Sequence, residues 1–168
     1  MKKKEDVILL VFGNGGHKEQ MKRLYSNMLE SLETNDKKHK FISISEKGYP
    51  LNKELINFEI PELRNKHSRI ESLIKLPIFI KNFLSIMTII NKTYNVKIII
   101  STGPGIIIPI SLYFKFKKNI QIVFLETWSR FETKSFTGRF MYKIADKFYI
   151  QNKSLKKLYP NSIYGGLL

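Results

Sequence analysis

Short apolar runs alternate with longer amphipathic segments along most of the chain. A run that is apolar at nearly every position is typical of a strand in a parallel sheet, because both faces of such a strand are covered. Turn-forming residues separate these runs. The pattern predicts strands at residues 7–12, 41–45, 58–60, 96–101, 120–125 and 148–150.

The segments between the runs carry apolar residues at helical spacing. In residues 18–33, apolar side chains recur at intervals of three and four and form one face. Residues 64–94 predict a mostly helical stretch, divided into two pieces near Pro77, because proline suits the first turn of a helix. Further helices are predicted at 106–116 and 138–145, and one turn at 154–158.

Strands that alternate with helices through short connections predict an α/β fold with a parallel sheet. The chain has 168 residues, 43% of them hydrophobic, which suits a single Rossmann-like domain with its own core over residues 1–168. It contains no cysteine, which excludes a disulfide framework, thiolate metal sites and a cysteine nucleophile.

The charge pattern suggests an anionic partner. The net charge is +15, from 29 Lys and Arg against 14 Asp and Glu, although a biased lysine-rich composition alone would produce much of it. Residues 72–125 contain no acid and are otherwise basic and apolar, which favours contact with an anionic membrane surface. The longest apolar stretch, 78–90, falls short of the roughly 20 residues that a membrane-spanning helix needs.

The first candidate site is the loop that follows the first strand, Gly13, Asn14, Gly15 and Gly16. Glycines let the backbone approach a ligand, and the start of the next helix presents unpaired N–H groups to an anion. The spacing matches neither a P-loop nor the dinucleotide-binding GxGxxG motif. A tight turn without a ligand is the alternative.

A second loop after the strand at 96–101 has a similar composition. It contains Ser101, Thr102, Gly103 and Gly105. Since the carboxyl ends of parallel strands lie at one edge of the sheet, both loops are predicted to face one cleft, where open α/β sheets bind ligands.

Two side chains at this edge are candidates for acid–base chemistry. His17 titrates near neutrality and is predicted either to take a proton from an acceptor hydroxyl or to bind phosphate. Glu126 follows the strand at 120–125 and is predicted to bind sugar hydroxyls, orient His17 or act as a base; a salt bridge to Arg130 is the alternative. No run of His, Asp and Glu has metal-ligand spacing, so no metal site is predicted.

Several of these segments, in this order, resemble a known family. The motifs are GNGGH at 13–17, STGPG at 101–105, ETWSR at 126–130, SFTGR at 135–139, Ala145-Asp146, Gln151 and YGG at 164–166. They are similar to the oligosaccharide-biosynthesis proteins that form the acceptor-side half of split GT-B glycosyltransferases. The eukaryotic member is the membrane-anchoring subunit of the N-acetylglucosamine transferase that adds the second sugar to dolichyl diphosphate, and bacterial relatives serve capsule and exopolysaccharide synthesis.

The resemblance implies that this chain is the N-terminal half of a GT-B fold and needs a small partner subunit that binds the UDP-sugar. The UDP-sugar is a substrate, and no cofactor is expected. The chain would hold a polyprenyl-diphosphate-linked acceptor at the cytoplasmic face of the membrane. Arg130 and the two glycine loops are then expected at the acceptor diphosphate, where the similar peptidoglycan N-acetylglucosamine transferase places its glycine loops. Asn14 is a departure, because relatives often have serine there.

The eukaryotic proteins have an N-terminal membrane anchor, whereas strand one comes almost at once here. We therefore expect peripheral membrane contact through a helical segment at about 70–94. The residues expected to make it are Lys75, Phe79, Lys81, Phe83 and Met87.

In the family, the C-terminal end of this subunit docks onto the partner. The tail at about 160–168 is therefore expected to dock through Tyr164, Leu167 and Leu168, with a tail folded back on its own core as the alternative. The rival function is a non-catalytic membrane scaffold that only recruits and activates the partner. A nucleic-acid binder is disfavoured, because no RNA-binding motif interleaves aromatic and basic residues here.

Overall fold

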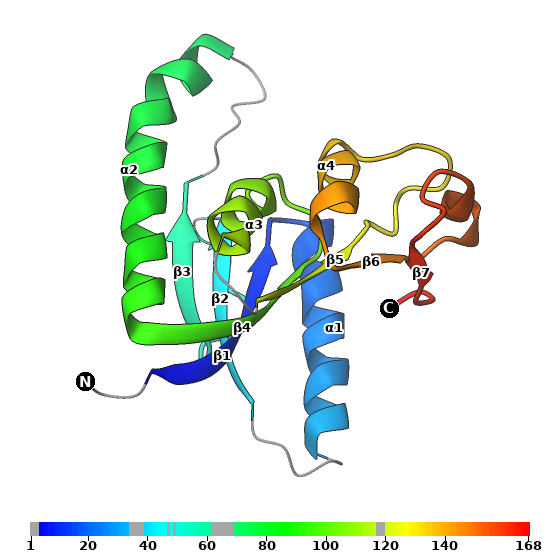
Figure 1. Cartoon of the computed structure of the whole chain (residues 1–168), viewed down its shortest axis with the longest axis horizontal. Helices are drawn as coiled ribbons and strands as arrows, with labels where there is room; N and C mark the ends of the chain where they lie inside the picture. Colours follow the sequence, from blue (N-terminus) through cyan, green and yellow to red (C-terminus); the bar gives the residue numbers. More distant parts are fainter. Residues whose placement is uncertain (1–3, 34–38, 47, 49, 62–68, 117–119) are drawn as a thin grey trace.

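The chain folds around one seven-stranded parallel sheet with the strand order β3-β2-β1-β4-β5-β6-β7 (Figure 1). The computed structural model describes residues 4–33, 39–46, 48, 50–61, 69–116 and 120–168, without the side chains of 69–75. The strands are β1 (Glu5–Phe12), β2 (Lys40–Glu46), β3 (Ile56–Ile60), β4 (Tyr94–Ser101), β5 (Gln121–Leu125), β6 (Lys147–Ile150) and β7 (Ile163–Tyr164). The α/β fold with a Rossmann-like parallel sheet is confirmed.

Four α-helices and a short 3-10 helix connect these strands. They are α1 (Gly16–Glu33), α2 (Arg69–Thr93), α3 (Ile107–Lys115), α4 (Phe136–Ile144) and η1 (Lys153–Lys157). All six predicted strands are present. The seventh, β7, was not predicted, because a strand of two residues is too short to show a periodic pattern; it pairs with β6 as the outermost strand of the sheet.

The predicted division near Pro77 is wrong. Helix α2 is continuous from Arg69 to Thr93 and contains Pro77. A proline inside a helix removes one backbone hydrogen bond and crowds the preceding turn. Beyond it, Phe79, Phe83 and Met87 are buried against the sheet, and this packing favours continuation of the helix. Residues 64–68 of the predicted stretch lie outside the described residues.

The core has two halves because strand side chains alternate between the faces of the sheet. On β1, Ile8, Leu10 and Phe12 belong to the half under α1, with Met21 of that helix. Val7, Leu9 and Val11 belong to the other half, which α2, α3 and α4 cover. The side chains of α1 and those of the other three helices therefore meet opposite faces of one sheet.

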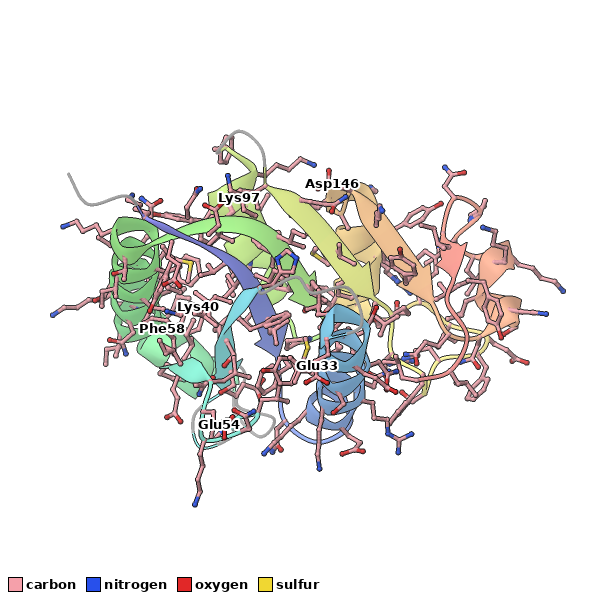
Figure 2. The ribbon with its side chains drawn as sticks, turned by 90° about the horizontal axis from the view of Figure 1, so that it is seen from below. Glu33, Lys40, Glu54, Phe58, Lys97 and Asp146 are labelled. Atoms are coloured by element: carbon pink, nitrogen blue, oxygen red, sulfur yellow. The ribbon has the colours of Figure 1, made fainter. Side chains whose placement is uncertain are left out.

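Because all strands of the sheet run in the same direction, they begin at one edge, the amino edge, and end at the other, the carboxyl edge. The polar groups at these two edges make different contacts. At the amino edge, Lys40 pairs with Glu5 at 2.7 Å and Lys97 with Asp6 at 3.7 Å. Figure 2 looks onto this edge from below. At the carboxyl edge, the strand order reverses between β1 and β4, the arrangement that opens a ligand crevice in α/β sheets. The predicted glycine loops leave the sheet at these two strands.

Candidate acceptor site at the carboxyl edge

His17 joins the two glycine loops. Its ring Nδ1 lies 2.6 Å from the Thr102 carbonyl oxygen, and the Thr102 hydroxyl donates to the His17 carbonyl oxygen at 2.7 Å. A carbonyl only accepts, so the contact assigns the ring proton to Nδ1 and leaves Nε2 with a free lone pair in the neutral ring. The half-buried His17 thus lies at the carboxyl edge of the sheet, and this contact does not use Nε2 of its neutral ring.

Gly103 makes room for this histidine. It has a φ of +117°, and a Cβ added there would lie 2.7 Å from His17 Cε1. Any side chain at this position would strain the backbone and collide with the imidazole. Gly103 of the second loop therefore leaves space for His17, which follows the first loop, and the two loops lie together at one edge of the sheet.

The donors offered to an anion lie in the first turn of α1. Glu19 N donates to Gly15 O at 3.1 Å, which makes Gly15 the residue that precedes the helix. The N–H groups of Gly16, His17 and Lys18 then lack an intrahelical acceptor. These groups point along the helix axis, where the helix dipole favours negative charge.

Two other amides of the loop are already satisfied within the chain. Asn14 N donates to Glu46 Oε2 at 3.1 Å, and Gly15 N donates to the Asn14 side-chain oxygen at 2.6 Å. Glu46 was not predicted, although it directly follows the predicted strand at 41–45, which is a signal available in the sequence; in the structure it is the last residue of β2. Its carboxylate lies against the loop on the β2 side, so the amides of this region without a partner inside the chain are those of the first turn of α1.

The polar side chains of the second loop are mostly buried and bonded within the chain, so they do not offer donors to a ligand. Ser101 and Thr102 are buried, and Ser101 Oγ accepts from Gly103 N at 3.4 Å. Gly105 is exposed at the edge. Arg130, predicted at the diphosphate, is exposed and donates to Thr133 Oγ1 at 2.9 Å.

Glu126 is enclosed under α4 and is not open at the carboxyl edge, which disfavours its predicted role as a base. It is fully buried and accepts from Ser135 Oγ at 3.0 Å, Tyr159 OH at 2.8 Å and Thr127 N at 3.0 Å. A Cβ on Gly138 would lie 1.9 Å from Glu126 Oε2, so α4 packs directly on the carboxylate.

The alternative ion pair with Arg130 is not formed either, since the pairs found among the described residues do not include it. The carboxylate holds the β5–α4 connection in place. Burial and the neighbouring Glu126 carboxylate raise the pKa of Tyr159 far above its usual value, so its hydroxyl stays a donor.

The β5–α4 connection reaches across to α1. The Arg23 guanidinium lies 5.0 Å from the centre of the Trp128 ring, and a Cβ on Gly16 would lie 3.9 Å from the indole nitrogen. Asn152 Nδ2 donates to the Trp128 carbonyl oxygen at 2.8 Å. Trp128 therefore flanks the start of the helix that carries His17, a placement that sequence reasoning did not assign to it.

Comparison with known proteins identifies the family. Residues 8–168 match the family described as "Oligosaccharide biosynthesis protein Alg14 like". The chain belongs to this family. It is 28% identical over 194 residues to the UDP-N-acetylglucosamine transferase subunit ALG14 of Candida glabrata, covering 99% of this chain and 80% of that protein. The human subunit of the same name is 32% identical over 74 residues, 41% of this chain and 34% of that protein. No solved structure gives a significant match.

The backbone of the tail of this Alg14-like chain is hydrogen-bonded to the end of β6. Gly165 N donates to Ile150 O at 3.0 Å, and Leu168 N donates to Gln151 Oε1 at 3.3 Å. Tyr164 and Leu167 nevertheless keep exposed side chains, whereas Leu168 is half-buried. Docking of a partner through this tail stays a prediction.

The predicted membrane contacts are wrong for three of five residues. Phe79, Phe83 and Met87 are buried because they form the side of α2 that packs on the sheet. Lys81 is exposed, and the side chain of Lys75 lies outside the described residues. The exposed large apolar residues of the three helices on this face are instead Leu76, Ile78, Ile80, Leu84, Ile89, Leu112, Phe136 and Phe140.

Within the described ranges, no helix is both long and apolar enough to cross a bilayer. Nor does that part of the chain contain a cluster of three or more His, Asp or Glu side chains suited to a metal ion. A cavity of about 300 Å³ lies between β3 and α2, lined by Glu59, Pro61, Asn82, Ser85 and Ile86. None of these lining residues belongs to the predicted acceptor site.

Proposed function

We propose that this chain is the acceptor-binding subunit of a two-component UDP-sugar transferase. Its substrate is a sugar joined through diphosphate to a polyprenyl lipid, and a small partner subunit binds the UDP-sugar donor. Family membership and the names of the relatives support a transferase subunit. The observation that carries the assignment of the acceptor site is His17, held by Thr102 where the two glycine loops meet.

In this proposal the acceptor diphosphate binds to the N–H groups of Gly16, His17 and Lys18. Negative charge is favoured there by the helix dipole and the lysine side chain. The proposal includes no resident cofactor in this chain, because the UDP-sugar is itself the activated donor.

His17 Nε2 takes the proton of the acceptor hydroxyl as its oxygen bonds to the anomeric carbon of the donor sugar. The bond from that carbon to the UDP oxygen breaks, UDP leaves with the bonding electron pair, and the anomeric configuration inverts. The Thr102 carbonyl stabilises the imidazolium that forms, because it accepts from the Nδ1 proton.

The decisive experiment is reconstitution with the donor-binding subunit. The purified chain alone is expected to show little transfer to a polyprenyl-diphosphate-linked sugar, and adding the partner should raise the rate greatly. Full activity of the chain alone would overturn the two-component proposal.

His17→Asn then tests the histidine itself. An amide retains hydrogen-bonding capacity but cannot act as a base near neutrality. Loss of a general base is expected to lower kcat by about 10²–10⁴-fold with little change in the KM for the acceptor. A raised KM with kcat preserved would instead make His17 a diphosphate ligand.

A second candidate, a non-catalytic scaffold, is favoured by one observation. The only buried carboxylate at this edge, among the residues described, serves the fold, and exposed tail side chains are available for docking. If His17→Ala leaves turnover unchanged while removal of Leu167 and Leu168 abolishes partner binding, the chain recruits the partner without taking part in chemistry.

We further propose that the chain acts at the cytoplasmic face of the membrane, as a peripheral protein, in capsule or exopolysaccharide synthesis. The exposed apolar side chains of α2, α3 and α4 support membrane contact. A neighbouring gene for a small UDP-sugar-binding subunit within a polysaccharide cluster would support this setting. A neighbourhood without any glycosyltransferase gene would argue against it.

A further inference from the structure

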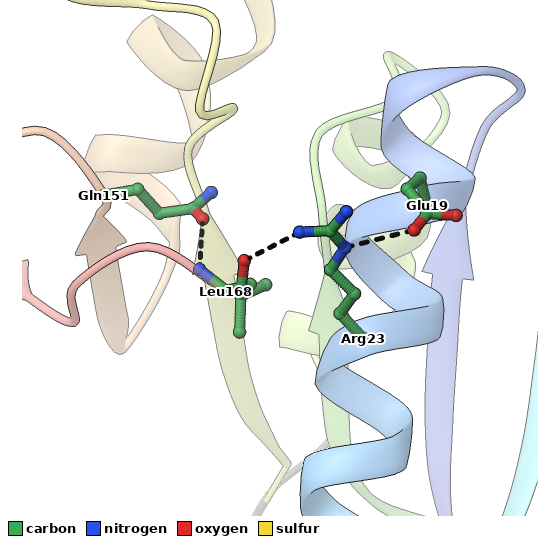
Figure 3. A network of polar contacts seen from close by, with 4 residues as sticks. All are labelled: Glu19, Arg23, Gln151 and Leu168. Carbon is green, nitrogen blue, oxygen red and sulfur yellow. Dashed lines mark hydrogen bonds and ion pairs between the residues drawn. The ribbon is translucent and has the colours of Figure 1, made fainter.

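The segment from Gly165 to Leu168 is held from both sides. Gln151, which is buried, accepts from Leu168 N through its side-chain oxygen and donates to the Glu126 carbonyl oxygen at 3.0 Å through its side-chain nitrogen. From α1, Arg23 Nη1 donates to Leu168 O at 3.2 Å while its Nε pairs with Glu19 at 3.1 Å (Figure 3). Together, Arg23 and Gln151 form what we call the tail clamp.

The clamp fixes the backbone of this segment but leaves apolar side chains outside. Ile163, Tyr164 and Leu167 are 42%, 46% and 70% exposed, respectively. The Lys153 ammonium lies 5.3 Å from the centre of the Tyr164 ring and adds positive charge beside them. An apolar surface with a basic border complements a protein patch that is apolar and bordered by carboxylates.

The clamp also connects this surface to the candidate acceptor site. Arg23 lies less than two helical turns beyond His17 on α1 and packs over Trp128, which flanks Gly16. Gln151 donates to the carbonyl oxygen of Glu126, where the β5–α4 connection that contains Trp128 begins. Both of these hydrogen bonds to Leu168 therefore come from residues that also contact the edge where His17 lies.

We propose that Arg23 and Gln151 are positioning residues that fix the docking surface for the donor-binding subunit beside the His17 crevice. A partner bound on Ile163, Tyr164 and Leu167 then lies next to the edge of the sheet that carries His17. This inference rests on the proposed function, because it assumes that the two subunits share one active site.

The experiment uses the full chain with its donor-binding subunit and compares Arg23→Gln and Gln151→Glu with Glu19→Gln as the matched control. Glu19→Gln removes the ion pair with Arg23 but leaves the bond from Arg23 to the tail. At saturating partner, each clamp variant is expected to lower kcat by about tenfold, because a small misplacement of reacting groups is costly. The KM for the acceptor should stay within about twofold, since the first turn of α1 is intact. Arg23→Lys should restore part of the rate, because it can still donate to Leu168 O.

A second measurement tests the clamp without transfer. The chain has no cysteine, so Leu167→Cys provides a unique site for a spin label. Arg23→Gln should increase the mobility of this label but not of a label at Leu112→Cys on α3. Unchanged mobility, or kcat values of the clamp variants equal to that of Glu19→Gln, would overturn the inference. Absent transfer by the wild-type pair, with the expected change in label mobility, would count against the proposed function and not against the clamp.

Discussion

The two faces of the sheet are covered by helices whose outer surfaces differ sharply. Helix α1, alone on one face, carries three basic and three acidic residues, and Leu29 is its single exposed large apolar side chain. On the other face, the described side chains of α2, α3 and α4 include five basic residues and no acid: Lys81, Lys92, Lys115, Arg139 and Lys143. Eight exposed large apolar residues accompany them.

This difference indicates what each face contacts. A polar face with balanced charge suits water, as on most soluble helices. An apolar surface whose helices carry basic side chains suits an anionic membrane, since lipid headgroups attract lysine while aliphatic side chains enter the interface. The same face that supplies the larger half of the core is thus also the one that we expect to contact lipid.

The titratable groups at the carboxyl edge follow the same division. His17 belongs to the α1 side and has a ring nitrogen free for substrate, whereas Glu126 lies under α4 and has its oxygens occupied. The α1 side therefore carries the proposed base, and the other side uses its carboxylate to hold a connection in place.

The largest expected effect separates the buried and exposed sides of α2. Phe83→Ala should lower the free energy of unfolding by about 3–5 kcal/mol, because it removes a ring packed against the core. Leu84→Ser on the exposed side should change it by no more than about 0.5 kcal/mol. Urea unfolding monitored by Trp128 fluorescence measures both. Similar losses for the two variants would contradict the sidedness of this helix.

We expect the face covered by α2, α3 and α4 to bind membranes and the face covered by α1 not to. Changing Ile80, Leu84 and Ile89 to serine should weaken flotation with anionic liposomes by at least about tenfold, since less apolar area enters the interface. Leu29→Ser on α1 is the control and should bind like wild type. Added salt should weaken wild-type binding, because it screens the lysines. Equal binding by all variants would remove the assignment of this face to lipid.

Glu126→Gln tests the division between chemistry and fold. An amide in place of the carboxylate leaves one of three donors without its acceptor, which should cost about 1–3 kcal/mol of stability. At a temperature where the variant stays folded, its kcat with the partner should equal that of wild type. A selective fall in kcat, without loss of stability, would return Glu126 to the chemical step.

The smallest expected effect is a pH dependence at Tyr159. Its pKa is raised in the folded state by burial and by Glu126, from an ordinary value of 10.0. Above that value the unfolded chain loses the tyrosine proton and the folded chain keeps it. Stability should therefore be fully present below about pH 10 and fall at higher pH, by at most about 1.4 kcal/mol per pH unit from this group. Tyr159→Phe should show a shallower alkaline decline in thermal unfolding, and an equal slope would exclude this cause.

The alternation of side chains along a strand explains why the burial of Glu126 was not predicted. Its position after an apolar strand correctly predicted the carboxyl edge, but edge position alone does not give a face. Phe124 and Glu126 are two residues apart and point to the same side, toward α4, whereas Leu125 points toward α1. Only the packing of α4 through Gly138 shows that the carboxylate is enclosed. The burial of Phe79 and Phe83 was missed for a related reason. Apolar residues lie on every side of α2, so periodicity alone could not show which side packs against the sheet.

The sequence alone determined six of the seven strands, the approximate positions of the helices, the parallel sheet and the edge at which the glycine loops open, because these follow from local periodicity and backbone freedom. Only the tertiary structure decided that the Thr102 carbonyl orients His17 and that Glu46 accepts from an amide of the first loop. It also decided that Arg23 and Gln151 form hydrogen bonds with Leu168. Each of those contacts joins residues more than ten positions apart. Their formation depends on how distant segments pack, which no local pattern records.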